Sequence, residues 1–187
     1  MTATYPTAFR TTSFLYALLA FASTYSLRAT QDDEPRLYYI SGLLNSAHDE
    51  PSEFAVRWAL WLALVPFVFL NLRPHLPPAW AAPVPAAWLL AIVTGVDFRV
   101  FGGPEPTDAL VYAHYGATAL VMLTSSLTLG ALGLARSAAF WLLVSAAYAT
   151  LFFVRRFVDD FEMPSEIFMV TEYVFYVYFT AALSFFV

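Results

Sequence analysis

Long apolar segments separated by short polar connectors dominate this chain of 187 residues. Six of the segments are long enough to form helices that cross a bilayer, because a membrane-spanning helix needs about 20 mostly apolar residues. They occupy residues 9–28, 54–72, 80–98, 108–134, 137–155 and 167–187. The pattern therefore predicts an all-α fold, a polytopic transmembrane bundle of six spans that forms one domain.

Two local features refine the expected bundle. Pro66 lies inside the second span and is expected to kink it, because proline removes a backbone donor and crowds the preceding turn. Only a tight turn around Arg136 separates the fourth and fifth spans, so these helices are expected to be antiparallel neighbours. Small residues on the two spans would allow close approach, although such residues are also common in membrane helices generally: they are Gly130, Gly133, Ser145 and Ala149.

The first span is the least apolar of the six, because Thr and Ser residues interrupt it. The first 31 residues contain Arg10 and Arg28 but no acidic residue. A secretory signal that is cleaved after residues 20–22 fits this composition, and so does an organellar targeting segment. We expect instead that the segment is retained as the first span.

The composition excludes several classes of site. Only 12% of the residues are charged, which is roughly half of the usual share of about 25% in soluble domains. There is no cysteine, and all nine basic residues are Arg. Disulfides, iron–sulfur clusters, thiolate zinc sites, lysine Schiff bases and Walker lysines are therefore excluded. The net charge of −5 argues against nucleic acid as a partner.

The charged residues divide unequally between the two ends of the expected bundle. Thirteen of the 14 acidic residues lie in the first, third and fifth connectors or beside them, and the last one, Glu172, lies near that end of its span. We name this end the acidic end. The opposite end, which we name the basic end, carries Arg10, Arg73 and Arg136 and no acidic residue. This asymmetry supports the count of six spans.

The orientation of the bundle in the membrane stays open. Of the nine Arg residues, six lie toward the acidic end, and the positive-inside rule counts Lys and Arg alone. That rule would place the acidic end in the cytoplasm or matrix, whereas the net charge favours the opposite orientation.

Ionisable residues near the acidic ends of the spans are the candidates for a functional site, because such groups are costly in a membrane. A ring of Arg, His and carboxylate groups could hold a lipid headgroup, with Arg making bidentate contacts to phosphate. The alternative is that the Arg residues reach to the interface and pair with nearby acids, and that His114 and Glu172 only join helices. The candidate residues are Arg57, Asp97, Arg99, His114, Arg155, Arg156 and Glu172.

An enzymatic role is not expected. A site with three histidine ligands is excluded, because His75 lies across the membrane from His48 and His114. His48, His114 and Glu172 could in principle hold the metal of a lipid hydrolase, but their spacing is not diagnostic. A haem would need two histidines on facing helices, and only His114 lies in a span. We expect no catalytic residue, no metal and no cofactor, with bound phospholipid instead.

Several short motifs occur in a characteristic order along the chain. They are Tyr39-Ile40-Ser41, Pro51-Ser52-Glu53, His114-Tyr115-Gly116-Ala117, Glu172-Tyr173 and Ser184-Phe185-Phe186. In this respect the chain resembles the six-span family of damage-regulated autophagy modulators and their relatives in glycolipid-anchor remodelling. It departs from the family at Tyr38, where Pro is usual, at Gly42, where Asp often follows the Ser, and in the altered Pro-Glu-Ser order. The resemblance implies an endomembrane protein that handles lipids or glycolipid anchors, with Ser41, His114 and Glu172 lining a polar site.

Two functions remain, and we favour the first. The chain would be a non-catalytic subunit of a respiratory or photosynthetic type of membrane complex in an organellar inner membrane. Its partners would be membrane lipids and other integral membrane subunits, because the aromatic surface is ample for helix contacts and no catalytic constellation is complete. The alternative is the lipid-handling protein of endomembranes that the resemblance implies.

Overall fold

The computed structural model describes residues 7–23, 27–29, 35–37, 51–100, 108–157 and 165–186, and within these ranges the fold is all-α with six long helices. The long helices are α1 (Thr7–Ser23), α3 (Pro51–Leu72), α5 (Pro83–Val100), α6 (Asp108–Ala131), α7 (Ala135–Phe157) and α8 (Ser165–Ala181). A short helix, α4 (Pro78–Ala81), precedes α5, and a π-helical segment, η1 (Ala182–Phe186), continues α8.

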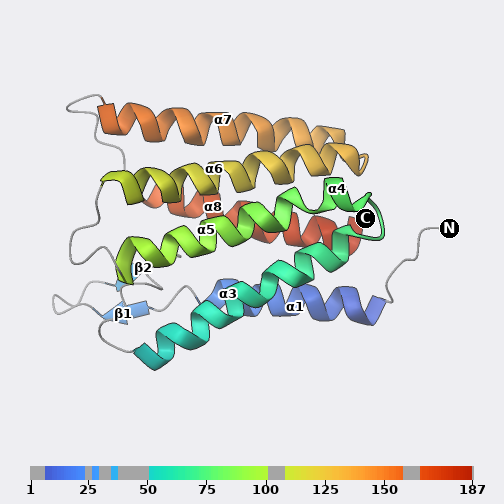
Figure 1. Cartoon of the computed structure of the whole chain (residues 1–187), viewed down its shortest axis with the longest axis horizontal. Coiled ribbons are helices and arrows are strands. Elements are labelled where there is room, and N and C mark those ends of the chain that lie inside the picture. Colours follow the sequence, from blue (N-terminus) through green and yellow to red (C-terminus); the bar gives the residue numbers. More distant parts are fainter. Residues whose placement is uncertain are drawn as a thin grey trace.

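The long helices lie side by side along the long axis of the molecule, and the chain reverses direction at its two ends (Figure 1). One end holds the start of α1, the connection from α3 to α4, the turn between α6 and α7, and the end of η1. This is the basic end. The acidic end holds the starts of α3, α6 and α8 and the ends of α5 and α7, with the strands β1 (Leu27–Ala29) and β2 (Pro35–Leu37) nearby.

The expectation for the first span is wrong at its C-terminal side. We expected a helix over residues 9–28, whereas α1 ends at Ser23 and residues 27–29 form β1, which pairs antiparallel with β2. Arg28 is the cross-strand partner of Arg36 in this small hairpin. Ser and Thr residues near the end of α1 have low helix propensity because their side chains compete for backbone hydrogen bonds, which agrees with an earlier end.

The other helices lie close to their expected ranges, and two boundaries have a clear cause. The expected span 80–98 is divided between α4 and α5, with Pro83 as the first residue of α5, a position where its missing N–H costs nothing. α6 ends at Ala131 rather than at residue 134, because Gly133 adopts a φ of 88°. Pro66 lies within α3, which continues from Pro51 to Leu72.

The turn after α6 is a Schellman motif. The N–H of Gly133 donates to the carbonyl of Gly130 at 3.0 Å, and the N–H of Leu134 donates to the carbonyl of Leu129 at 2.9 Å. These two bonds satisfy carbonyl groups at the helix end, and the positive φ at the turn favours glycine. The turn makes α6 and α7 antiparallel neighbours, as the sequence predicted.

Helix α8 lies at the centre of the aromatic core. Trp61 of α3 and Trp88 of α5 meet Tyr176 of α8 edge to face, with ring centroids 5.4 and 5.0 Å apart. Trp141 of α7 meets Phe175 of α8 at 5.0 Å. The π-helical continuation of α8 packs on α1, where Phe14 and Phe185 are 4.9 Å apart. Four helices therefore gather around α8 and η1.

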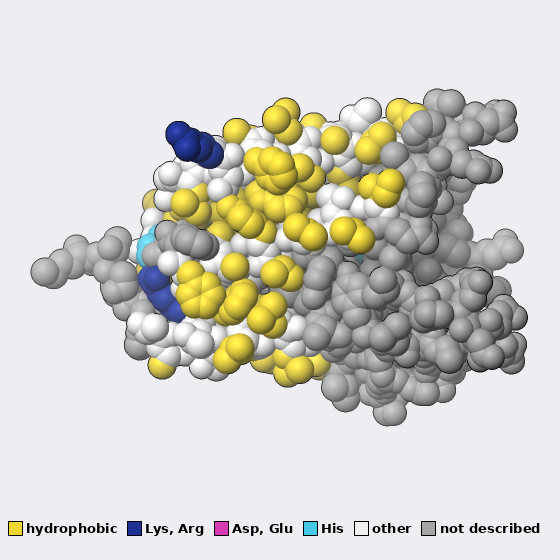
Figure 2. Space-filling model, turned by 180° about the vertical axis from the view of Figure 1, so that it is seen from behind, with side chains coloured by type: hydrophobic (Ala, Val, Ile, Leu, Met, Phe, Trp, Pro, Cys, Tyr) yellow, Lys and Arg dark blue, Asp and Glu magenta, His cyan; other side chains and the backbone are white. Residues whose placement is uncertain are grey.

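Large apolar side chains also cover the outside of the bundle. Exposed residues of this kind occur on α1, α5, α6, α7 and α8, and Leu143 of α7 is 73% exposed. Figure 2 shows such side chains in yellow across the middle of one face. Among the described residues, the stretch Ala135–Val154 of α7, with 20 residues and a mean hydropathy of 1.8, is long and apolar enough to cross a membrane. Two shorter apolar helical stretches are Ala59–Leu72 and Pro78–Thr94.

Candidate functional site

Glu172 is a carboxyl group buried inside the helical bundle. It lies about two turns into α8, toward the acidic end, and is 3% exposed. The hydroxyl group of Tyr148, which is also buried on α7, donates a hydrogen bond to Oε1 of Glu172. Burying a carboxyl group costs free energy unless its oxygens accept hydrogen bonds. The bond from Tyr148 on α7 to Glu172 on α8 therefore offsets part of this cost.

Two further tyrosines lie close to this pair. Tyr176 follows Glu172 by one turn of α8, and both side chains are buried. Tyr115 of α6 has its ring centroid 6.5 Å from that of Tyr148, and it stacks on Phe152 of α7 at 4.3 Å. We name the four residues Glu172, Tyr148, Tyr176 and Tyr115 the Glu172 cluster. It brings polar groups from α6, α7 and α8 together within a core that is mostly apolar.

Two tryptophans cover the Tyr176 side of the cluster. Trp61 and Trp88 are both buried and place their rings at 78° and 79° to the ring of Tyr176. Such edge-to-face pairs are worth about 0.5–1.5 kcal/mol beyond the area that they bury. α3 and α5 therefore close the cluster on a second side.

His114 lies beside the cluster on α6. It is 2% exposed, and its ring centroid is 5.6 Å from that of Tyr115, the next residue along the helix. His114 and Glu172 stand out in the sequence as ionisable residues within helices, and the structure buries both of them in the half of the bundle toward the acidic end. Tyr115 and Tyr148 connect His114 to Glu172. The ring of His114 lies beside that of Tyr115, Tyr115 lies beside Tyr148, and Tyr148 donates its hydrogen bond to Glu172.

The remaining candidate residues are placed only by their helices. Arg57 lies in the first half of α3, Asp97 and Arg99 lie in the last turns of α5, and Arg155 and Arg156 lie in the last turn of α7. All of these segments reach the acidic end (Figure 1). The structure describes only the backbone of these five residues and not their side chains, and Ser41 lies outside the described residues. The headgroup pocket that they would form with His114 and Glu172 stays a prediction.

Sequence reasoning missed Tyr148 and Tyr176, because a tyrosine in an apolar helix resembles any other core aromatic residue. The spacing of Glu172 and Tyr176 is a signal that could have identified one of them, since residues four apart share a helix face. Among the described residues, no group of three His, Asp or Glu side chains is arranged to hold a metal ion. The chemistry that the cluster offers is hydrogen bonding by a carboxyl group and three phenols.

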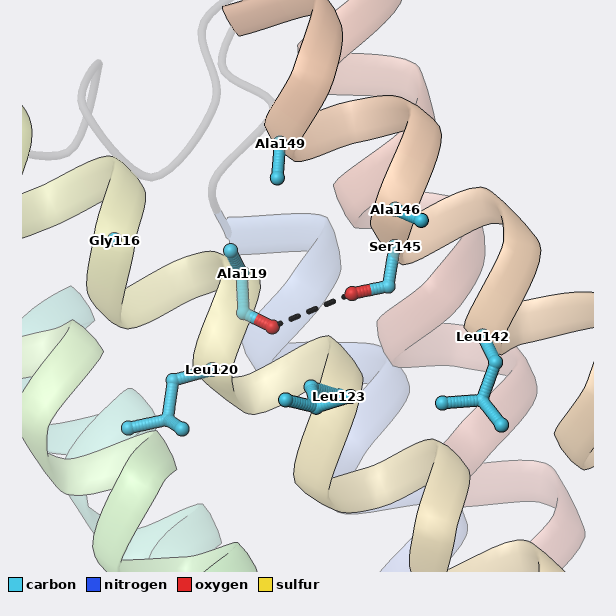
Figure 3. A pocket seen from close by; sticks show the side chains of 8 residues that line it. All are labelled: Gly116, Ala119, Leu120, Leu123, Leu142, Ser145, Ala146 and Ala149. Atoms are coloured by element: carbon cyan, nitrogen blue, oxygen red, sulfur yellow. Dashed lines mark hydrogen bonds between the residues drawn. The ribbon is translucent and has the colours of Figure 1, made fainter. Parts of the chain in front are cut away.

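A shallow groove of about 370 Å³ lies between α6 and α7 on the outside of the bundle (Figure 3). Its floor contains Ser145, whose hydroxyl donates to the carbonyl oxygen of Ala119 at 3.4 Å. Small residues of both helices make the groove, and three leucines flank it: the lining is Gly116, Ala119, Leu120 and Leu123 of α6 and Leu142, Ser145, Ala146 and Ala149 of α7. Two of the small residues noted in the sequence, Ser145 and Ala149, therefore line a surface hollow.

The other two small residues serve the turn between these helices. A Cβ atom at Gly130 would lie 3.4 Å from Cβ of Ala138, so the two helices approach closely there. Gly133 supplies the positive φ. Gly130 thus faces Ala138 near the turn, and Ser145 faces Ala119 farther along.

In comparisons with known proteins, no protein-family model, no curated protein and no solved structure matches the chain.

Proposed function

We propose that the chain is a six-span integral membrane protein that serves as a non-catalytic subunit of a larger membrane complex, of the respiratory or photosynthetic type. Its six long helices contain 17 to 24 residues, which corresponds to lengths of about 26 to 36 Å. The hydrocarbon core of a bilayer is about 30 Å thick. Exposed apolar side chains on five of these helices suit contact with lipid or with the helices of other subunits.

The observation that supports a subunit most directly is the groove beside the exposed face of α7. Leu143, Phe140 and Phe153 are large and exposed on this helix, next to a hollow lined by Gly116, Ala119, Ala146 and other small residues. In a bilayer, helices associate through surfaces where small residues permit close packing. A neighbouring helix could place a large side chain in this groove and cover the exposed leucine and phenylalanines.

The Glu172 cluster supports a structural role in preference to a catalytic one. Its carboxyl group accepts a hydrogen bond from Tyr148, and Trp61 of α3, Trp88 of α5 and Phe152 of α7 pack against the tyrosines of the cluster. Polar side chains of this kind join helices within membranes. Phospholipid would bind at the acidic end, where the candidate Arg residues lie.

Blue-native electrophoresis of native membranes tests the subunit role. We expect the chain to migrate in a complex that is much larger than 20.9 kDa and that withstands mild washing. The double variant Gly116→Leu/Ala149→Leu fills the groove and is expected to release the chain from this complex. Ala86→Leu is the matched control, because Ala86 is exposed on α5 and does not line the groove. Migration of the unaltered chain by itself would contradict the proposal.

A second function is favoured by the burial of both His114 and Glu172. These residues would line the polar site of a lipid-handling protein of the autophagy-modulator type in endomembranes. Under this alternative, the chain purifies alone with bound phospholipid or glycolipid. The double variant His114→Ala/Glu172→Ala would lose that lipid, while Gly116→Leu/Ala149→Leu would retain it.

A further inference from the structure

The basic end gathers three Arg residues from different parts of the chain. Arg10 lies in the first turn of α1, Arg73 directly follows α3, and Arg136 is the second residue of α7. Arg73 and Arg136 are exposed, and Arg10 is partly exposed. Figure 2 shows dark blue side chains at one end, beyond the yellow apolar surface. The sequence places no acidic residue at 1–31, 54–96 or 109–158.

The start of α1 and the connection after α3 lie close together at this end. Burial lowers the pKa of His75 from its ordinary value of 6.5, and the positive charge of Arg10 lowers it further. His75 lies two residues after Arg73, in the same connection. Arg10 and the residues around Arg73 therefore contribute to one positively charged region rather than to isolated charges.

An exposed tryptophan lies at the same end. Trp80 belongs to the short helix α4, which follows the connection after α3, and it is 63% exposed. Tryptophan has an apolar ring with one polar N–H group, so it favours the headgroup level of a membrane. The combination of Arg73, Arg136 and Trp80 has the composition of a surface that faces lipid headgroups.

We propose, on the basis of the six-span arrangement, that the basic end binds anionic phospholipid headgroups and so lies in the anionic leaflet. Arg73 and Arg136 contact lipid phosphates, Arg10 adds positive charge, and Trp80 lies among the headgroups. Arg forms charge-assisted hydrogen bonds to phosphate. This surface lies at the opposite end of the bundle from the headgroup pocket proposed at the acidic end.

Lipid titration of the full chain in neutral detergent tests this surface. Native mass spectrometry gives an apparent Kd for phosphatidylglycerol, with phosphatidylcholine as the uncharged reference. We expect tighter binding of phosphatidylglycerol, and Arg73→Gln/Arg136→Gln should weaken it by about 30-fold, since each Arg near an anionic surface contributes about 1 kcal/mol. Arg73→Lys/Arg136→Lys keeps the charge and should retain most of the binding. The matched control is Arg28→Gln/Arg36→Gln, in the paired strands β1 and β2 near the acidic end and outside the proposed headgroup pocket, which should leave the Kd unchanged.

Three binding results in the lipid titration would overturn the inference. They are equal binding of the two lipids by the unaltered chain, an unchanged Kd in Arg73→Gln/Arg136→Gln, and an equal or larger loss in Arg28→Gln/Arg36→Gln. Full displacement of the lipid by millimolar inorganic phosphate would also overturn it, because a free anion would then be the ligand. The failure of the proposed function is distinct: it appears in blue-native electrophoresis and in the side of the membrane to which each end is exposed.

Discussion

The hydroxyl group of Tyr148 on α7 donates a hydrogen bond to the buried carboxyl group of Glu172 on α8. Tyr148 and Glu172 are 24 residues apart in sequence, and each lies in a helix that is otherwise largely apolar. The bond fixes how α7 and α8 face each other, since either group alone would be a polar atom buried without that partner. It is the centre of the polar cluster that joins the helices toward the acidic end.

Loss of this bond is expected to destabilise the bundle. Tyr148→Phe leaves an oxygen of Glu172 without its donor, which costs about 1–3 kcal/mol. Tyr178→Phe is the comparison, because Tyr178 donates to Ser137, a neutral and only partly buried partner. Its loss should cost only about 0.5–1.5 kcal/mol. Unfolding in detergent with added dodecyl sulfate, followed by circular dichroism, measures both, and equal costs would argue against a special role for the Glu172 bond.

A double-mutant cycle tests whether Tyr148 and Glu172 act as a unit. Glu172→Leu removes the carboxyl group, so the phenol of Tyr148 no longer contributes through it. We expect the cost of Tyr148→Phe to fall in the Glu172→Leu background, with a coupling of about 0.5–3 kcal/mol. Additive costs in the same unfolding experiment would mean that the two groups do not interact.

Truncation of Trp88 to alanine should destabilise the bundle much more than truncation of Trp80. Trp88 is buried against Tyr176 and Phe179, with centroid distances of 5.0 and 6.1 Å. Trp88→Ala leaves a cavity beside the cluster, and its expected cost is about 3–5 kcal/mol. Trp80 is exposed, so Trp80→Ala should change the stability in detergent by less than about 0.5 kcal/mol. Comparable costs would contradict the placement of α5 against α8.

Replacing Gly116 of α6 and Gly133 of the turn after it by alanine should change the stability in opposite directions. Gly133 has a φ of 88°, so Gly133→Ala introduces strain of about 1–2 kcal/mol. A Cβ atom at Gly116 meets no atom within 4 Å, and Gly116→Ala should stabilise the helix by about 0.5–1 kcal/mol. Thermal unfolding of the two variants in one detergent measures both effects. Destabilisation by Gly116→Ala would show that the groove is more crowded than we describe.

The pKa of His75 should report the contact between the start of α1 and the connection after α3. Because the folded pKa lies below the ordinary value of 6.5, the unfolded chain binds the proton more tightly. The contribution of His75 to stability is therefore present above about pH 6.5 and is lost as the pH falls through the folded pKa. Arg10→Gln should raise this pKa part of the way, since burial is the larger cause. An NMR titration of the imidazole ring, with its signal assigned through His75→Gln, measures the pKa. An unchanged pKa in Arg10→Gln would contradict the contact between the start of α1 and the connection after α3.

The existence of the six long helices was predictable from the long apolar runs, whereas the pairing of residues 27–29 with residues 35–37 was not. These three-residue strands lie in a polar connector without alternation, and the chain before them was assigned to the first span. The end of α6 had a usable signal in Gly133, since glycine is favoured after a helix.

The candidate site was predictable only in part. His114 and Glu172 are conspicuous as ionisable residues within helices, and both are buried. The partner of Glu172 could not be read from the sequence, because the pairing with Tyr148 depends on how α7 and α8 rotate against each other. Tyr176 shares a helix face with Glu172 at a spacing of four residues, so its proximity was accessible in principle.

The side of the membrane on which each connector lies tests the six-span arrangement most directly. The chain has no cysteine, so single cysteines at positions 73 and 136 of the basic end and at 105 and 160 of the acidic end can be labelled in sealed vesicles. We expect an impermeant maleimide to label 73 and 136 from one side, and 105 and 160 only from the other side. Labelling of both pairs from the same side of intact vesicles would contradict the six crossings.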